Sequence, residues 1–225
     1  MAEGAARDRA WGAAIDHAPA IALIRAEVPE QALRAGAACW AGGFRLTALS
    51  AQIPSAPDIL SALGARADLL VGLWGIDSVD ALDAFDLGRV AFAFGSLEGA
   101  EGVQTLEDTG VPFIPTCRDL EQARAKLEGG TSTLCLEEVS SLGGPAAVAD
   151  LIRSNPGAQI FCAGGIGGDE LAPYIEAGAR GLILTNALMS PSLLSRGDYR
   201  SVRNYAAAVH QEATRLGRTS TERMG

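Results

Sequence analysis

The chain has 225 residues, and its 27 acidic residues outnumber its 18 lysine and arginine residues, which gives a formal charge of −9. This balance argues against a nucleic-acid partner, which requires a basic surface, and against binding to anionic membranes. No apolar run approaches the roughly 18 residues of a membrane span, and the N-terminal residues do not resemble a targeting peptide. We therefore expect a cytoplasmic protein without membrane insertion.

Lysine is almost absent, because 17 of the 18 basic residues are arginine and the single lysine is Lys126. Any mechanism with a nucleophilic amine would have to use Lys126 or the chain's own N-terminus. Codon bias in a GC-rich genome would explain the count equally well, so the count alone does not identify a function.

The four cysteines are dispersed among apolar residues and form no C-x-x-C pair; they are Cys39, Cys117, Cys135 and Cys162. This pattern predicts buried, reduced thiols, and the spacing is not that of zinc ligands. We expect neither a metal nor a cofactor.

The predicted elements begin with a helix over Ala2–Ala14, within an N-terminal segment of residues 1–18. Eight apolar runs follow, each with the length of a parallel strand buried on both faces: Ile21–Arg25, Phe44–Ser50, Asp68–Ile76, Arg89–Ser96, Val111–Cys117, Ser132–Glu137, Ala158–Gly165 and Gly181–Met189. Helix-like segments alternate with these runs, at Pro29–Ala41, Ala56–Ala65, Ser78–Phe85, Ala100–Thr109, Asp119–Glu128, Gly144–Ser154, Asp169–Ala177 and Asp198–Leu216.

Eight strand–helix units without a break in composition predict an α/β fold, a single (β/α)8 TIM barrel over residues 19–217 with an extra N-terminal helix. Residues 218–225 are polar and are expected to form a flexible tail. A doubly wound open sheet has the same local pattern and is the alternative fold.

In a barrel, the functional site lies at the carboxyl ends of the strands. Those ends carry, in order, Arg25 and Glu27, Ser50 and Gln52, Trp74 and Asp77, Phe94 and Ser96, Thr116 and Arg118, Glu137 and Glu138, Gly164 and Gly165, and Thr185 and Asn186. His17 and His210 fall on terminal helices, so no Ser/His/Asp or Cys/His set assembles at the strand ends, and hydrolase chemistry is not expected.

A glycine-rich segment, Ala163-Gly164-Gly165-Ile166-Gly167-Gly168-Asp169, ends the seventh strand and is expected to open a helix. Backbone N–H groups at such a turn can hold a phosphate or carboxylate. A tight strand-to-helix turn without a ligand would also require these glycines, and both interpretations remain open.

Charged residues at the strand ends are the weak catalytic candidates. Adjacent residues in a strand point to opposite sides, so Glu137 and Glu138 are not a matched acid/base pair. Arg25 and Arg118 could each hold a carboxylate or phosphate, although a surface ion pair is the commoner role of such residues.

From about Ala20 to about His210 the chain resembles the 2-keto-3-deoxy-6-phosphogluconate/4-hydroxy-2-oxoglutarate aldolases, class I enzymes on a (β/α)8 barrel that are usually trimeric. The resembling motifs occur in the family's order: Gly42-Gly43-Phe44-Arg45-Leu46 (G-G-I-R-V), Val71-Gly72 (V-G-A-G-T), Val111-Pro112-Phe113-Ile114-Pro115 (I-P-L-I-P), Gly164-Gly165-Ile166 (T-G-G-I) and Gly197-Asp198-Tyr199 (G-D-Y). The resemblance implies the same fold, a homotrimer and a small phosphate or carboxylate ligand.

The reacting residues of that family are not matched. Its Schiff-base lysine in strand six aligns with Cys135, and its acid/base glutamate aligns with Ala48. Other positions of the family's site align with Gln52, Gly75, Ala163, and Leu184, Thr185 and Asn186, where the family has a phosphate-binding serine. The strand ends and the glycine-rich turn, together with this aligned position, give the anion-binding candidates Arg25, Gly164, Gly165, Gly167 and Asn186.

Lys126 belongs to the helix-like segment Asp119–Glu128, which places it on the outer ring of the barrel. Class I aldolase activity is therefore predicted to be absent. One interpretation is a non-catalytic aldolase relative with a binding, regulatory or structural role. A protein partner is compatible with this interpretation. The alternative is an active lyase with rebuilt, metal-assisted 2-oxo acid chemistry based on Glu137, Glu138 or Arg118. Trp74, Phe94 and Leu184 are expected to fill part of the mouth, and a filled mouth would favour the first reading.

Overall fold

The computed structural model describes the backbone of residues 2–66, 68–97 and 100–224, and the side chains of 9–66, 68–97, 103–106 and 108–219. Eight parallel strands close into a barrel in sequence order. They are β1 Ala20–Ile24, β2 Leu46–Ser50, β3 Leu70–Ile76, β4 Ala93–Gly95, β5 Phe113–Cys117, β6 Thr133–Leu136, β7 Gln159–Ala163 and β8 Gly181–Leu184. This confirms the TIM barrel and excludes the open sheet.

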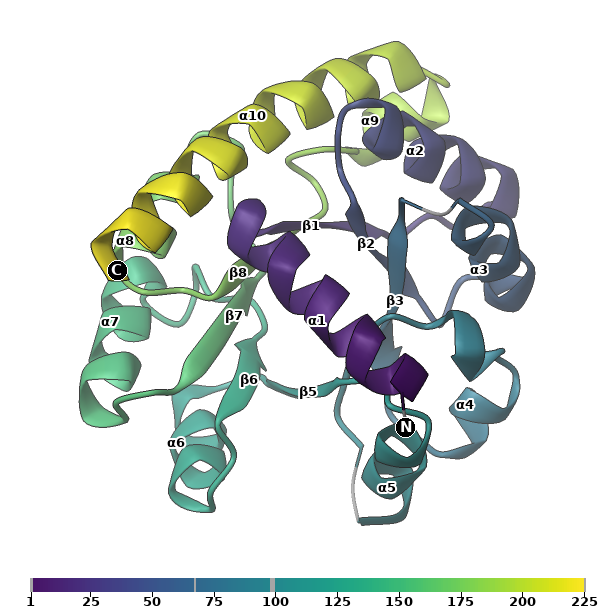
Figure 1. Cartoon of the computed structure of the whole chain (residues 1–225). Helices are drawn as coiled ribbons and strands as arrows, with labels where there is room; N and C mark the ends of the chain where they lie inside the picture. Colours follow the sequence, from purple (N-terminus) through teal and green to yellow (C-terminus); the bar gives the residue numbers. More distant parts are fainter. Residues whose placement is uncertain (1, 67, 98–99, 225) are drawn as a thin grey trace.

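Helices surround the barrel, as Figure 1 shows. They are α1 Ala2–His17, α2 Pro29–Ala41, α3 Ala56–Gly64, α4 Asp80–Asp83, α5 Ala100–Asp108, α6 Leu120–Glu128, α7 Gly144–Ser154, α8 Leu171–Glu176, α9 Pro191–Ser195 and α10 Tyr199–Met224, with a 3₁₀ helix at Leu87–Arg89. The extra N-terminal helix is confirmed, whereas the short α9 was not expected.

Several predicted boundaries differ from the structure. The runs expected at Arg89–Ser96 and Gly181–Met189 contain much shorter strands, β4 and β8. Helix α10 continues to Met224, so the residues expected as a polar tail are helical up to that point.

The register closes the sheet between its first and last strands. Ala22 of β1 lies opposite Thr47 of β2 on one side and opposite Leu184 of β8 on the other. Residues that follow β1 and β8 are consequently neighbours at the mouth, as are those that follow any other adjacent pair.

The apolar residues form two layers. One lies between the strands and the surrounding helices, and the other fills the barrel interior with inward-facing side chains such as Phe92, Phe94 and Phe161. Helix α1 crosses the end of the barrel where the strands begin (Figure 1), and its Trp11 ring lies 4.2 Å from that of Phe92. Among the described side chains, Trp11 of α1 therefore covers the interior at this end.

Within the described ranges, no helix is both long and apolar enough to cross a lipid bilayer.

Candidate functional site

A cavity of about 920 Å³ opens at the carboxyl ends of the strands. It is lined by most of the polar residues predicted at the strand ends: Arg25, Gln52, Asp77, Ser96, Thr116, Arg118, Glu137, Glu138, Thr185 and Asn186. Glu27 and Ser50 do not line it. The mouth of the barrel is thus open and wide enough for a small molecule.

The floor of the cavity is apolar. Leu23, Trp74, Ala163 and Ile183 line it from four different strands, and the Trp74 ring lies 5.5 Å from that of the fully buried Phe94. Leu184 was expected to fill the mouth, and this prediction is wrong. Because its neighbours Ile183 and Thr185 face inward, Leu184 faces outward and packs in the layer beneath the helices.

One ion pair lies on the β5–β6 side of the mouth. Arg118 Nε lies 3.5 Å from Glu137 Oε2; the Arg118 side chain is 78% exposed, and that of Glu137 is 26% exposed. At this exposure the pair is worth at most about 1 kcal/mol. Its main effect is to neutralise one of the two guanidinium groups that line the cavity.

Glu137 and Glu138 were expected to point to opposite sides, and the structure differs. β6 ends at Leu136, and Glu138 takes a left-handed backbone conformation with φ of 50°. The alternation of a strand no longer applies there, so both carboxylates line the cavity.

The glycines after β7 lie against the loop that follows β6. A Cβ at Gly164 would lie 2.5 Å from Glu138 Cα, and a Cβ at Gly165 would lie 1.8 Å from Ser140 Oγ. Both glycines have positive φ, 85° and 70°. Close packing of two loops is therefore sufficient to explain both residues.

The glycine-rich segment does not open a helix directly, contrary to the prediction. α8 begins only at Leu171, and the N–H of Gly167 donates a 2.7 Å hydrogen bond to Glu170 Oε2. A carboxylate of the chain itself therefore occupies one of the N–H groups expected to bind an anion. Glu170 was not among the predicted site residues, and a glutamate three residues after a turn glycine is the signal that could have indicated it.

The β8–β1 side of the mouth has a different character. Arg25 directly follows β1, and Thr185 and Asn186 directly follow β8, so the three residues meet where the first and last strands pair. No carboxylate among the described side chains lies within ion-pair distance of Arg25. A guanidinium, a hydroxyl and an amide group together can donate several hydrogen bonds to a carboxylate or phosphate.

Cys135 and Ala48 both face the barrel interior and are fully buried. Neither lines the cavity. Burial raises the pKa of the Cys135 thiol well above its usual range, with smaller contributions from neighbouring acidic groups. The thiol therefore stays protonated at neutral pH and is a poor nucleophile.

Lys126 lies in the last turn of α6, on the outer ring, as predicted. It does not line the cavity at the mouth. His17 and His210 do not line it either; His210 packs against Phe44, near the end where the strands begin.

All four cysteines are buried and free. Among the side chains whose positions are described, no three of His, Cys, Asp and Glu lie close enough together to hold a metal ion. The metal-assisted version of the alternative reading therefore has no preformed set of ligands in the described part of the mouth.

Solved structures with a similar fold include aldolases. A KDPG aldolase from Legionella pneumophila, with pyruvate captured as a covalent carbinolamine intermediate, is 18% identical and matches 88% of this chain and 97% of its own at a TM-score of 0.73. The 2-keto-3-deoxy-6-phosphogluconate aldolase from Zymomonas mobilis ATCC 29191 is 14% identical, with 88% and 95% covered and a TM-score of 0.74.

A third similar structure is a cube-shaped protein cage designed by fusing symmetric oligomeric domains, with 24% identity, 92% and 76% covered, and a TM-score of 0.72. No protein-family profile and no curated protein sequence matches the chain. At these identities the structural similarity establishes an aldolase-like barrel fold, and the activity has to be argued from the site.

Proposed function

We propose that this chain is an aldolase-like barrel that binds a small carboxylate or phosphate ligand at its mouth without Schiff-base chemistry. The observation that carries the proposal is the buried Cys135, which aligns with the strand-six lysine of the aldolases. A thiol cannot form an imine, and the single lysine of the chain, Lys126, lies on an outer helix.

The ligand site in this proposal is the β8–β1 side of the mouth, formed by Arg25, Thr185 and Asn186. Arg118 is neutralised by Glu137, and Glu170 accepts the hydrogen bond of the Gly167 N–H. Arg25 is the remaining guanidinium that lines the cavity. Gly164, Gly165 and Gly167 follow β7, which pairs with β8, so they shape the adjoining wall and are secondary candidates for anion contacts.

Trapping with borohydride tests the absence of an imine. The protein is incubated with pyruvate or glyoxylate, reduced, and measured by intact mass, with a Lys126→Arg variant as the control. We expect no adduct on either protein. An adduct on the wild type that is missing from Lys126→Arg would overturn the proposal, whereas an adduct on both proteins would identify the N-terminal amine.

Thermal unfolding with phosphate, sugar acids and 2-oxo acids tests ligand binding. A ligand at about 100 times its dissociation constant adds roughly 2.7 kcal/mol of stability, which corresponds to an increase of about 5–11 °C in Tm for a chain of this size. Arg25→Ala should remove this increase, and Arg118→Ala should retain it. A panel without any shift would contradict the anion site.

The open mouth favours a second candidate, an active lyase that uses Glu137 or Glu138 as the acid/base group, because a cavity lined by carboxylates remains accessible. Exchange of the pyruvate methyl protons in D₂O, followed by proton NMR, discriminates between the two candidates. Exchange above the buffer rate that is lost in Glu137→Gln or Glu138→Gln would show acid/base catalysis of enolisation and favour the lyase, and exchange at the buffer rate supports the binding protein.

We also propose that the protein is a cytoplasmic homotrimer. The trimer is supported by the resemblance to the aldolases and by the similarity to an oligomeric domain used in the designed cage. Four free, buried thiols agree with a reducing compartment.

A further inference from the structure

An arginine-rich groove lies between α2 and α10 on the outside of the barrel. Its volume is about 480 Å³, and it is lined by Arg34, Ala37, Ala38, Tyr199, Arg200 and Arg203. Three guanidinium groups around a floor of two alanines form a basic surface on a chain whose formal charge is −9. We refer to these six residues as the basic groove.

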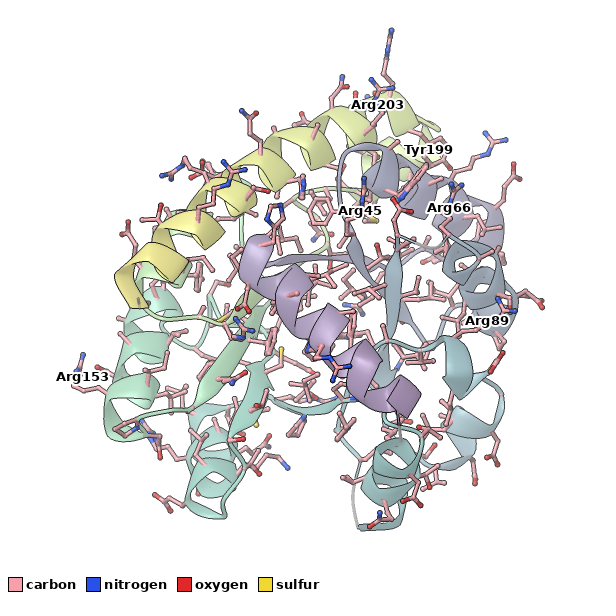
Figure 2. All side chains as sticks on the ribbon, viewed as in Figure 1. Arg45, Arg66, Arg89, Arg153, Tyr199 and Arg203 are labelled. Atoms are coloured by element: carbon pink, nitrogen blue, oxygen red, sulfur yellow. The ribbon has the colours of Figure 1, made fainter. Side chains whose placement is uncertain are left out.

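Two further arginines extend the basic surface on the other flank of α2. Arg66 lies 4.1 Å from the centroid of the Trp40 ring, and Arg45 pairs with Asp68. Figure 2 shows Arg45, Arg66, Tyr199 and Arg203 gathered on this side of the molecule, with Arg153 on the opposite side.

The arginines of the groove are only partly neutralised. Arg34 pairs with Glu30 and lies over the Tyr199 ring. Among the described side chains no carboxylate lies within ion-pair distance of Arg200 or Arg203. The groove therefore has a surplus of positive charge and an aromatic ring, a composition that is enriched at protein interfaces.

The complementary charge is found on the same chain. Asp77, Asp80, Asp83 and Asp86 recur at every third residue, and all four are exposed; Asp80 and Asp83 lie on α4, whereas Asp77 also lines the cavity at the mouth. Asp86 pairs with Arg89, whereas no described cation lies within ion-pair distance of Asp80 or Asp83. We refer to these four residues as the acidic strip.

The groove and the strip of one molecule do not meet, because α3 lies between α2 and α4 (Figure 1). Two exposed large apolar side chains belong to or flank the elements that carry the groove, although neither lines it. Val28, which directly precedes α2, is 46% exposed, and Tyr205 of α10 is 55% exposed.

We propose that the basic groove binds the acidic strip of a second copy of this chain. Copies with a charge of −9 repel one another at long range, and juxtaposing unlike surfaces selects one orientation over others. Because the two surfaces differ, the contact is heterologous, and it closes into a ring such as the proposed trimer when the rotation between neighbouring copies divides a full turn. This inference rests on the self-association proposed above and adds the surfaces that produce it.

Charge reversal tests the contact. The molar mass of the wild type is measured by light scattering after size exclusion, alongside Arg200→Glu/Arg203→Glu, Asp80→Arg/Asp83→Arg and the variant that combines all four changes. Arg124→Glu/Arg153→Glu is the matched control for the groove variant, because it changes the net charge by the same amount but on α6 and α7. Circular dichroism establishes that each variant is folded.

We expect the wild type and the control to have the mass of several 23.2 kDa chains. Each reversed surface should weaken association by at least about tenfold, because like charges then face each other, and the combined variant should recover the wild-type mass. Association should also weaken between about 0.1 M and 1 M NaCl, where the Debye length falls from about 10 Å to about 3 Å.

Two results would overturn the inference. A monomeric wild type removes both the trimer and its interface. If the wild type associates and both reversed variants keep its mass, this interface alone is ruled out. The same holds if the wild type associates but the folded combined variant stays dissociated. The anion site is measured independently by the ligand-induced shift in Tm, so neither result affects it.

Discussion

Replacement of Gly164 by alanine should destabilise the protein strongly, because two separate costs apply at this position. The residue has φ of 85°, and a Cβ would lie 2.5 Å from Glu138 Cα and 2.6 Å from its backbone N. A left-handed backbone costs a residue with a Cβ roughly 1–2 kcal/mol, and an overpacked contact costs about 1–3 kcal/mol. The obstructing atoms are backbone, so no rotation of a side chain can relieve the contact.

The expected loss is therefore about 2–5 kcal/mol, which corresponds to a decrease of roughly 4–20 °C in Tm at about 2–4 °C per kcal/mol. Gly130→Ala is the matched control. Gly130 has φ of 95°, but nothing lies within 4 Å of its Cβ position, so only the backbone cost of about 1–2 kcal/mol applies. Gly12→Ala, within α1 and also unobstructed, should stabilise the helix by up to about 1 kcal/mol.

Equilibrium unfolding in urea, followed by circular dichroism, measures the three variants under the same conditions. The midpoint should fall from Gly12→Ala to Gly130→Ala to Gly164→Ala, with an unchanged dependence on urea concentration. If Gly164→Ala unfolds at the same urea concentration as Gly130→Ala, the packing argument is refuted. The case for Gly164 as an anion-binding residue would then be stronger.

Gly165 provides a second test of the same reasoning, because its obstruction is a side chain. A Cβ there would lie 1.8 Å from Ser140 Oγ and 2.6 Å from Ser140 Cβ. Ser140→Gly should therefore recover part of the stability that Gly165→Ala loses, and the two changes should not be additive. Strict additivity would show that the two loops do not make this contact.

Two further predictions concern the buried core. Trp11→Ala should cost about 3–5 kcal/mol in thermal unfolding, because the ring packs against Phe92 and Phe161 at the closed end of the barrel; a loss below about 1 kcal/mol would mean that α1 is not docked. Burial raises the pKa of Cys39 and Cys162 to about 12. At pH 8 their thiolate fraction is therefore about a thousandfold below that of an ordinary thiol. Iodoacetamide should label them only after unfolding. Stability should fall as the pH rises from about 9 towards 12, because the unfolded thiols then release protons that the folded ones retain; constant stability over that range would contradict the raised pKa values.

The fold was predictable because strands in a parallel barrel are buried on both faces and appear as continuous apolar runs. The same signal overestimated two strands. Leu188 and Met189 follow β8 and are almost completely buried, yet their N–H groups bond to the Thr185 carbonyl in a turn and not to a neighbouring strand. Val90 is equally buried before β4, where it ends the 3₁₀ helix. Hydrophobicity reports burial, whereas a strand also requires backbone pairing, which the sequence does not show.

The candidate site was predictable up to the last residue of each strand. Alternation along β8 places Ile183 and Thr185 inward and Leu184 outward, whereas the alignment with the family motif carries no information on the direction of the Leu184 side chain. Beyond the strand ends, the direction of each side chain depends on loop conformation. Loop conformation sets the left-handed backbone of Glu138 and the hydrogen bond that Glu170 accepts from the Gly167 N–H, so the strand pattern could predict neither.

The open mouth makes a purely structural role less favourable, but it does not supply the amine that aldolase chemistry requires. A mouth filled by Trp74 and Phe94 would have favoured a structural role, yet the two rings close only the layer beneath a cavity of about 920 Å³. Cys135 does not line that cavity and is fully buried. A ligand in the mouth would therefore meet neither an amine nor an accessible thiolate at the strand-six position. Arg25, Thr185 and Asn186 remain accessible at the rim, and for this reason we favour non-covalent binding of a small anion over covalent catalysis.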